Sequence, residues 1–257
     1  RSTLFPYTTL FRSALLAFSA SAAGATAPAS SIEAIVGSGG ADVLRGNDAD
    51  NTFVVVGDGS RGASDIDGRG GDDTVDFSQI DVAADGRGIH VDLGADGGGV
   101  AIAADGTTLA ILTAIETLVG SAGDDELCGD DTDNTLYGGE GSDTFVFVDF
   151  ENDDWRGESD GKRRGGDDVV ADFDADWDSG DVIAFSTSLL EGLERHEARE
   201  LLEDFLDAFG QDEEDGFRFV FGEDQSVLLL QVFRNDIDER HSQSGGLVVA
   251  DGHFFYI

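Results

Sequence analysis

Residues 120–146 read GSAGDDELC, GDDTDNTLY and GGEGSDTFV, three consecutive segments of nine residues. Each segment begins with Gly, carries Asp or Asn at its sixth position, and places one large apolar residue (Leu127, Leu136 or Phe145) at its eighth. Glycines allow the first six residues to turn with positive φ, and the last three residues suffice for a short strand. A strict nine-residue period therefore predicts stacked turns and strands, with the eighth residue of each unit facing a core.

The same pattern recurs earlier in the chain. Residues 31–55 align without gaps to residues 114–138, an offset of 83 residues, and 13 of the 25 positions are identical. Single units also begin at Gly68 and near Arg163. We therefore expect one repeat region over residues 31–186. It consists of block 31–76, spacer 77–113 and block 114–186.

The units fit the pattern G-G-x-G-x-D-x-U-x, in which U is a large apolar residue. In this respect the chain resembles the haemolysin-type, or RTX, calcium-binding repeat family over roughly residues 31–186. The resemblance implies a mainly β fold: a right-handed parallel β-roll or β-helix with Ca²⁺ as its cofactor. The chain departs from the family at Asn51 and Asn134, where the family prefers Asp, and at Ser38 and Arg69, which break leading Gly pairs. Those units are expected to bind calcium more weakly.

In such a roll two units complete one coil, so units two apart stack on the same side. The pairs predicted by this count are Asp125 with Asp143, Asp42 with Asp73, and Asn134 with Asp168. Ca²⁺ takes six to eight oxygen ligands at flexible geometry, which carboxylates and backbone carbonyls supply, whereas Mg²⁺ demands stricter octahedral geometry. Asp and Gly are also ordinary turn residues, so a single unit proves little. The predicted metal-site residues are Asp125, Asp143, Gly120, Gly138, Gly141, Asp42, Asp73, Gly37, Gly68, Asn134, Asp168 and Asn51.

The net charge of −39 at pH 7 comes from 54 acidic and 15 basic residues. A chain so acidic repels nucleic acid and anionic membranes and attracts cations, so we expect its folding to be coupled to metal binding. A single cysteine, Cys128, excludes an internal disulfide framework, and the four scattered His offer no zinc cluster. The chain contains no apolar run long enough to cross a membrane as a helix.

The two ends of the chain differ from the repeats. Residues 1–13, RSTLFPYTTLFRS, reproduce the translation of a sequencing-library adapter, so we interpret them as an artefact. The Ala-rich residues 14–30 fit a signal-peptide remnant or a linker equally well. Residues 187–257 predict a small α+β cap, with a helical stretch from about Ser188 to Phe209 followed by strands. This cap is also a candidate secretion region.

The leading functional hypothesis is a secreted, calcium-binding RTX module that folds outside the cell and leaves it through a type I secretion exporter. The alternatives are the non-catalytic C-terminal part of an exported enzyme (a protease, lipase or polysaccharide-modifying enzyme) and a fragment of an adhesin. We expect no enzymatic activity from this chain. Formal matches to a dinucleotide fingerprint at residues 57–62 and to a nucleophile elbow at residues 157–161 lack the flanking elements that they require. The sequence indicates no protein or glycan partner.

Overall fold

The chain is described by a computed structural model over residues 16–17, 33–94, 98–147, 166–175, 180–186, 210–220, 226–233, 249–250 and 254–256. The adapter-like residues 1–13, most of residues 14–30 and the expected helix from Ser188 to Phe209 lie outside these ranges. Within the ranges all regular elements are β-strands, joined by turns. None of the described segments forms a helix with the length and apolar character needed to span a membrane.

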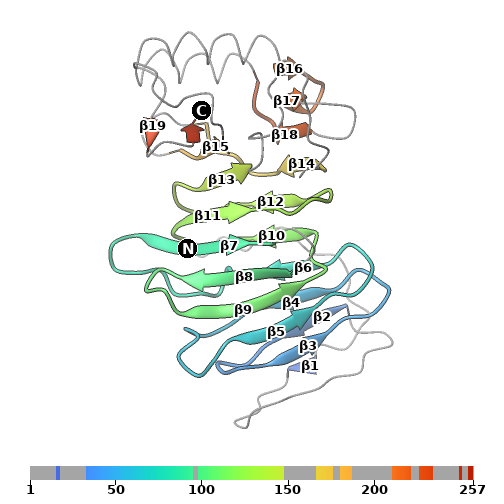
Figure 1. Ribbon diagram of the computed structural model, residues 1–257, viewed down its shortest axis with the longest axis vertical. Helices are drawn as coiled ribbons and strands as arrows, with labels where there is room; N and C mark the ends of the chain where they lie inside the picture. Colours follow the sequence, from blue (N-terminus) through green and yellow to red (C-terminus); the bar gives the residue numbers. More distant parts are fainter. Residues whose placement is uncertain are drawn as a thin grey trace, which may run out of the picture.

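The repeat strands alternate between two ten-stranded sheets that face each other along a column (Figure 1). Sheet A contains β1 (Leu16–Ala17), β2 (Ala34–Val36), β4 (Thr52–Val54), β6 (Thr74–Asp76), β10 (Thr117–Val119), β12 (Thr135–Tyr137) and β14 (Asp167–Val170), all parallel to their neighbours. Sheet B contains β3 (Val43–Arg45), β5 (Ser64–Asp67), β11 (Asp124–Cys128), β13 (Thr144–Phe147) and β15 (Val182–Ser186). Successive strands therefore lie on opposite sheets, and the predicted mainly β parallel roll is confirmed.

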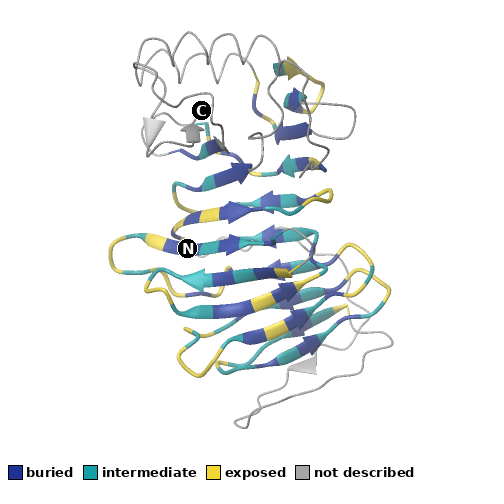
Figure 2. Cartoon of the chain, in the orientation of Figure 1, coloured by how far each residue is buried: buried dark blue, intermediate teal, exposed yellow. Residues whose placement is uncertain are grey.

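The core lies between the two sheets and includes the eighth residue of each repeat unit, together with apolar residues of the spacer and of the C-terminal strands. The three-residue strands have an intermediate–buried–intermediate pattern, since alternate side chains of a strand face opposite ways (Figure 2). In sheet B, Leu127 aligns with Phe145, and Phe145 with Ile183. The eighth residues of the units are buried, as the nine-residue period predicts: Leu44, Val75, Leu127, Leu136, Phe145 and Val170.

The spacer forms an antiparallel meander inside sheet B. It contains β7 (Arg87–Asp92), β8 (Gly98–Ala103) and β9 (Thr108–Thr113). Strand β9 pairs in parallel with β5 and β7 with β11, whereas in sheet A β6 pairs directly with β10. Three strands of sheet B thus occupy the place of one, which widens that sheet by roughly 10 Å at about 4.8 Å per added strand. The broad middle of the molecule in Figure 1 is this meander.

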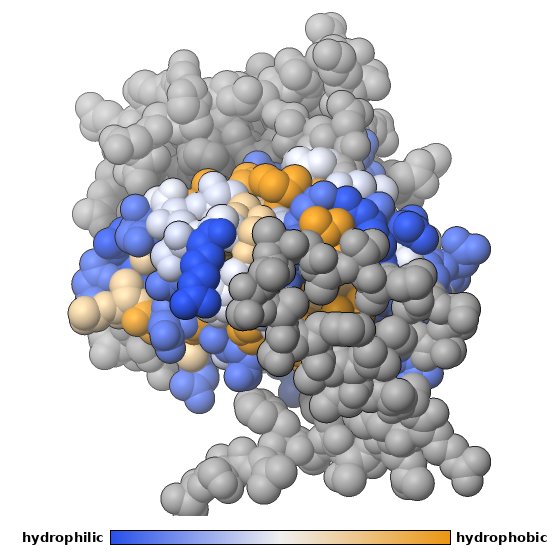
Figure 3. Space-filling model, turned by 90° about the horizontal axis from the view of Figure 1, so that it is seen from below, coloured by the Kyte–Doolittle hydropathy of each residue, from blue (hydrophilic) through white to orange (hydrophobic). Residues whose placement is uncertain are grey.

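The C-terminal strands extend both sheets beyond the repeats. In sheet A, β18 (Ser226–Leu230) pairs in parallel with β14, and β17 (Gly216–Val220) and β16 (Gly210–Asp212) follow antiparallel. In sheet B, β20 (Phe254–Tyr256) and β19 (Val249–Ala250) pair antiparallel beyond β15. In β17 the rings of Phe217 and Phe219 are buried, whereas Arg218 between them is not. At the opposite end of the roll, hydrophobic residues show as separate small patches among hydrophilic ones (Figure 3).

Candidate calcium-binding loops

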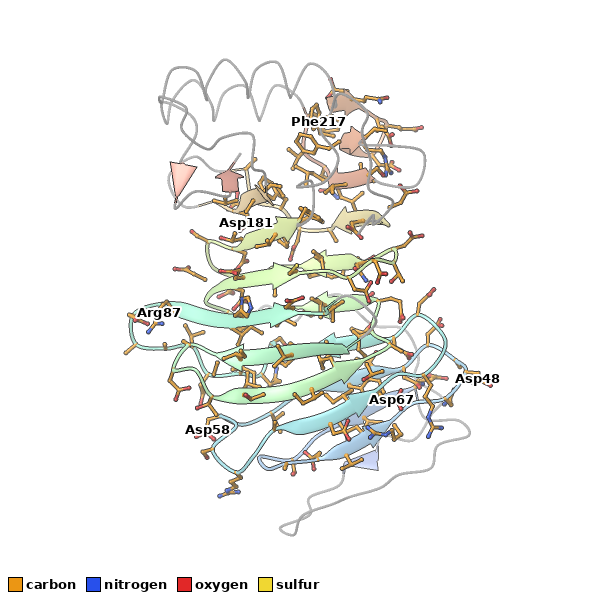
Figure 4. All side chains as sticks on the ribbon, in the orientation of Figure 1. Asp48, Asp58, Asp67, Arg87, Asp181 and Phe217 are labelled. Atoms are coloured by element: carbon orange, nitrogen blue, oxygen red, sulfur yellow. The ribbon has the colours of Figure 1, made fainter. Side chains whose placement is uncertain are left out.

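The turns of the roll gather along two opposite edges. The loops that lead into sheet A strands, which we call edge A, include residues 46–51, 68–73 and 129–134. Those that lead into sheet B strands, edge B, include residues 120–125 and 138–143. Figure 4 shows Asp48 of edge A and Asp58 of edge B on opposite sides of the molecule. Because loops of one edge stack directly on each other, their acidic residues meet across adjacent coils.

The sixth residues of stacked units are joined by a ladder of hydrogen bonds. On edge B, the backbone N–H of Asp125 donates to Asp143 Oδ1 at 2.9 Å, and that of Asp143 donates to Asp181 Oδ1 at 2.9 Å. On edge A, the N–H of Asn134 donates to Asp168 Oδ1 at 2.9 Å. The predicted pairs Asp125/Asp143 and Asn134/Asp168 are therefore adjacent in the structure.

The predicted pairing of Asp42 with Asp73 is wrong. The N–H of Asp42 donates to Ser64 Oγ at 3.3 Å on edge B, whereas Asp73 lies on edge A and accepts the N–H of Asn51 at 2.7 Å. The turn over residues 57–64 leads into β5 and, with that strand, forms half of one coil, as a repeat unit does. Its sequence nevertheless does not fit the nonapeptide pattern. Each such turn moves the next unit to the opposite edge, so counting only recognisable units misassigns the partner.

Two ladder carboxylates keep one oxygen buried without a hydrogen-bond donor. Asp73 is 0% exposed and Asp143 is 1% exposed, and neither Asp73 Oδ2 nor Asp143 Oδ2 has a partner among the described residues. In other units the second oxygen is satisfied locally, as where the N–H of Ser38 donates to Asp42 Oδ2 at 2.6 Å. An ionised oxygen that is buried and unpaired is costly, and a bound cation removes that cost.

The leading glycine of each unit leaves space in which oxygens converge. A methyl group at Gly120 would meet both Asp125 Oδ2 and the carbonyl oxygen of Gly138, and one at Gly138 would lie 2.8 Å from Asp143 Cγ. Carboxylate and carbonyl oxygens thus approach each other beside the main chain. This donor set matches the ligand preference of Ca²⁺, so the residues present fit the metal that the repeat pattern implies.

Substitution of Gly138 by alanine is expected to destabilise the calcium-loaded protein by about 1–3 kcal/mol, because the added methyl group displaces the Asp143 carboxylate. Urea unfolding in saturating calcium measures the effect. Gly39→Ala is the matched control, since a methyl group there meets nothing within 4 Å and the residue is exposed. Equal urea midpoints for Gly138→Ala and Gly39→Ala would contradict the proposed role of Gly138 in leaving space for the Asp143 carboxylate.

Burial raises the pKa values of the ladder carboxylates. The largest cause in each case is loss of hydration, and neighbouring carboxylates add to it: the pKa of Asp143 rises to about 8, that of Asp168 to about 7, and those of Asp73 and Asp125 to about 6. Without a cation the fold therefore favours the protonated form of these groups. A divalent ion supplies the missing positive charge and lets them stay ionised.

Not every sixth residue is an anion. Asn51 Oδ1 accepts the N–H of Asn47 at 2.9 Å, and Asn134 Oδ1 accepts the N–H of Asp130 at 2.7 Å. These amides close their own turns as Asp does elsewhere, but they add no charge. At Arg69, which replaces the second glycine of its unit, φ is +77°. Such a conformation costs a side-chain-bearing residue on the order of 1–3 kcal/mol.

The meander interrupts edge B but not edge A. Ile89 and Ala110 occupy the sixth position of their coils in sheet B, and the N–H of Ile89 donates to Asp125 Oδ1 at 2.6 Å. Neither side chain can bind a cation, so the ladder that contains Asp125 ends there. On edge A, the N–H of Asp73 donates to Glu116 Oε2 at 2.7 Å, so the ladder of the first block reaches the start of the second.

Three acidic residues that accept backbone N–H groups across adjacent coils were not predicted from the sequence: Glu116, Asp172 and Asp181. The two oxygens of Asp172 accept the N–H groups of Gly138 and Gly139 at 2.9 and 3.1 Å. Burial raises the pKa of Asp172 and of Asp181. A signal for Glu116 was present, because Glu116 is followed by Thr-Leu just as Asn134 is. Among the described residues, no three His, Cys, Asp or Glu side chains lie where they alone can hold a metal, so backbone oxygens must complete each site.

A protein-family model matches the part of the chain that contains these loops. The model of the RTX calcium-binding nonapeptide repeat matches the chain in four copies, over residues 30–54 and 113–145. These ranges contain the loops of Asp42, Asn51, Asp125, Asn134 and Asp143. No curated protein matches the chain.

Proposed function

Because the chain carries RTX calcium-binding nonapeptide repeats, we propose that it is a calcium-responsive module that folds when Ca²⁺ fills the loops along its two edges. The observation that best supports the proposal is the buried, unpartnered Oδ2 of Asp143, beside the carbonyl-lined space at Gly120 and Gly138. We place the first calcium site there, between loops 120–125 and 138–143. Asp73, on edge A, marks a second position of the same kind.

The proposed role is binding and structure rather than catalysis. The ladder carboxylates Asp143, Asp168 and Asp181 accept backbone N–H groups, an arrangement that suits a resident cation. Extracellular calcium modules work near roughly 10⁻⁴–10⁻³ M. A module with such affinity stays unfolded at the low calcium concentration of a cytoplasm and folds outside. This behaviour suits passage through a type I exporter, which we propose as the partner and which export assays in a host carrying one can test.

Isothermal titration of the metal-free chain with CaCl₂ tests calcium binding directly. We expect saturable binding of more than one ion, and much weaker binding of Mg²⁺ at the same ionic strength, because Mg²⁺ requires rigid octahedral geometry and releases water reluctantly. Titration with NaCl controls for screening of the −39 net charge. Equal responses to the two divalent ions would show general charge neutralisation and would refute a calcium site.

A further inference from the structure

The turn between β9 and β10 is three residues shorter than the six-residue repeat turns of edge A over residues 46–51, 68–73 and 129–134. Only Ala114, Ile115 and Glu116 separate the two strands, whereas turns such as 68–73 have six residues. The backbone register is nevertheless kept: the N–H of Gly68 donates to Thr113 O at 3.0 Å, and Thr117 aligns with Thr74 and Thr135. Ala114 and Glu116 therefore stand at the first and sixth positions of a turn that lacks the middle of the repeat.

Glu116 takes over the bond that Asp makes in a full-length turn. Its Oε2 accepts the N–H of Asp73 at 2.7 Å, equivalent to the bond from Asn51 N–H to Asp73 Oδ1 one coil earlier. The additional methylene of Glu lets the carboxylate reach the adjacent coil even though the turn is short. The ladder of edge A thus reaches from the first repeat block to the start of the second, where it meets a residue outside the nonapeptide pattern.

Several oxygens converge at this junction. Asp73 Oδ2 is buried and has no partner among the described residues, and a methyl group on Gly68 would meet this oxygen and the carbonyl oxygen of Ala114. Ala114 has a positive φ of +51°, an unusual backbone conformation for a residue with a side chain, at the position that presents this carbonyl. Within the described part of the chain no cationic side chain forms a salt bridge with Asp73 or Glu116.

We propose that Asp73, Glu116 and the Ala114 carbonyl hold a Ca²⁺ ion that links the two repeat blocks across the meander. The inference rests on the proposed calcium-binding function and extends it to a site that pairs a repeat turn with a non-repeat turn. Two carboxylates and carbonyl oxygens supply hard, flexible ligands. The bound ion ties residues of the first block to the start of the second on edge A, while on edge B the meander keeps the loops of the two blocks apart.

The test uses the full chain and CaCl₂ as the probe. Glu116→Gln keeps the shape and the acceptor for the Asp73 N–H but removes the charge, so calorimetry is expected to show one site fewer, or one site weakened by about tenfold or more. Glu33→Gln is the matched control: Glu33 holds the same place in the first copy and is exposed. The control is expected to bind calcium like the unmodified chain. A Glu116→Gln variant that titrates like the control overturns the inference.

A double variant that combines Glu116→Gln with Asp73→Asn distinguishes one calcium site shared by both residues from two separate sites. Asp73→Asn keeps an oxygen that can accept the N–H of Asn51, and it should remove the same single calcium site as Glu116→Gln. The double variant should then lose no more than either single one, because both residues serve one ion. Loss of two sites in the double variant would contradict the proposal. Circular dichroism at saturating calcium checks folding, and if Glu116→Gln does not fold, Asp73→Asn carries the test. An unmodified chain that binds no calcium would instead refute the proposed function as a whole.

Discussion

Removal of calcium at neutral pH is expected to unfold the strands of the repeat region, with loss of the β-sheet signal in far-ultraviolet circular dichroism. The unloaded roll combines a net charge of −39 with ionisable carboxylates buried in both edges, among them Asp73, Asp125, Asp143 and Asp168. Self-repulsion and the loss of hydration at these groups both oppose the compact state. Without calcium, burial of the apolar core must offset both the charge repulsion and the lost hydration of these carboxylates.

The expected magnitude explains why unfolding should be complete rather than local. An ion present at about 100 times its dissociation constant stabilises the fold by about 2.7 kcal/mol per site. Two or more sites therefore contribute about as much as the whole stability of an ordinary domain, which is about 5–15 kcal/mol. Because each strand pairs with the next coil, loss of one loop weakens its neighbours in the stack.

The measurement is a chelator titration followed by spectroscopy and by size in solution. The unloaded chain is expected to expand and to regain its dimensions when CaCl₂ is restored. NaCl at matched ionic strength is the control, since it screens charge without occupying the loops. An unchanged spectrum after complete chelation would rule out coupling between calcium and folding.

Acidification is expected to stabilise the calcium-free protein, which is the second large effect. The pKa values of Asp73 and Asp125 rise to about 6, that of Asp168 to about 7 and that of Asp143 to about 8, with burial as the main cause. For an acid whose folded-state pKa is raised, stability is fully present below the unfolded value near about 4 and is lost as pH rises through the folded value. Each group adds a slope of up to about 1.4 kcal/mol per pH unit within its own window.

The calcium-free chain, which is expected to be unfolded at neutral pH, should therefore regain its β-sheet signal as the pH falls through the raised pKa values of these carboxylates. With calcium the sign reverses, because the ligands must be deprotonated and affinity increases with pH. Lower net charge also favours folding at acidic pH, so a pair of variants is needed to isolate the buried group. Both remove one charge from the loop 138–143: Asp143→Asn at a buried position and Glu140→Gln at an exposed one.

Without calcium, Asp143→Asn should regain its β-sheet signal at a higher pH than the unmodified chain, because it mimics the protonated acid. The two chains should become equally stable only at about pH 4 or below, where the acid is protonated in both the folded and the unfolded state. With calcium, Asp143→Asn should be less stable, since a ligand is lost. Glu140→Gln should change little in either condition. If both variants respond alike, general charge rather than burial of Asp143 governs the pH dependence.

The repeat pattern predicted the local structure well. The eighth residues Leu127 and Phe145 lie in the core, the last three residues of the units form strands, and Asp125 stacks on Asp143. These features depend only on contacts inside one unit or between consecutive recognisable units. The period of nine residues carries that information directly.

The partners of Asp42 and Asp73 could not be obtained in the same way. Their assignment depends on how many half coils lie between two units, and two of these coils, formed by residues 57–64 and 114–116, do not follow the pattern. The path of the meander through sheet B is also invisible in the repeat count. It decides that the ladder of edge B is interrupted at Ile89 and that the ladder of edge A reaches Glu116.

The sequence by itself thus determined the turn-and-strand unit, the side chains that face the core and the acidic character of the loops, because glycine, aspartate and a single apolar residue act within nine residues. Only the tertiary structure decided which loops meet, which carboxylate oxygens are left buried without a donor, and that Glu116 stands beside Asp73. Those properties arise from stacking between coils that are distant in the chain. In that stack, a turn that lacks the consensus sequence shifts the following strand to the opposite sheet just as a consensus turn does, so it also decides which loops are adjacent.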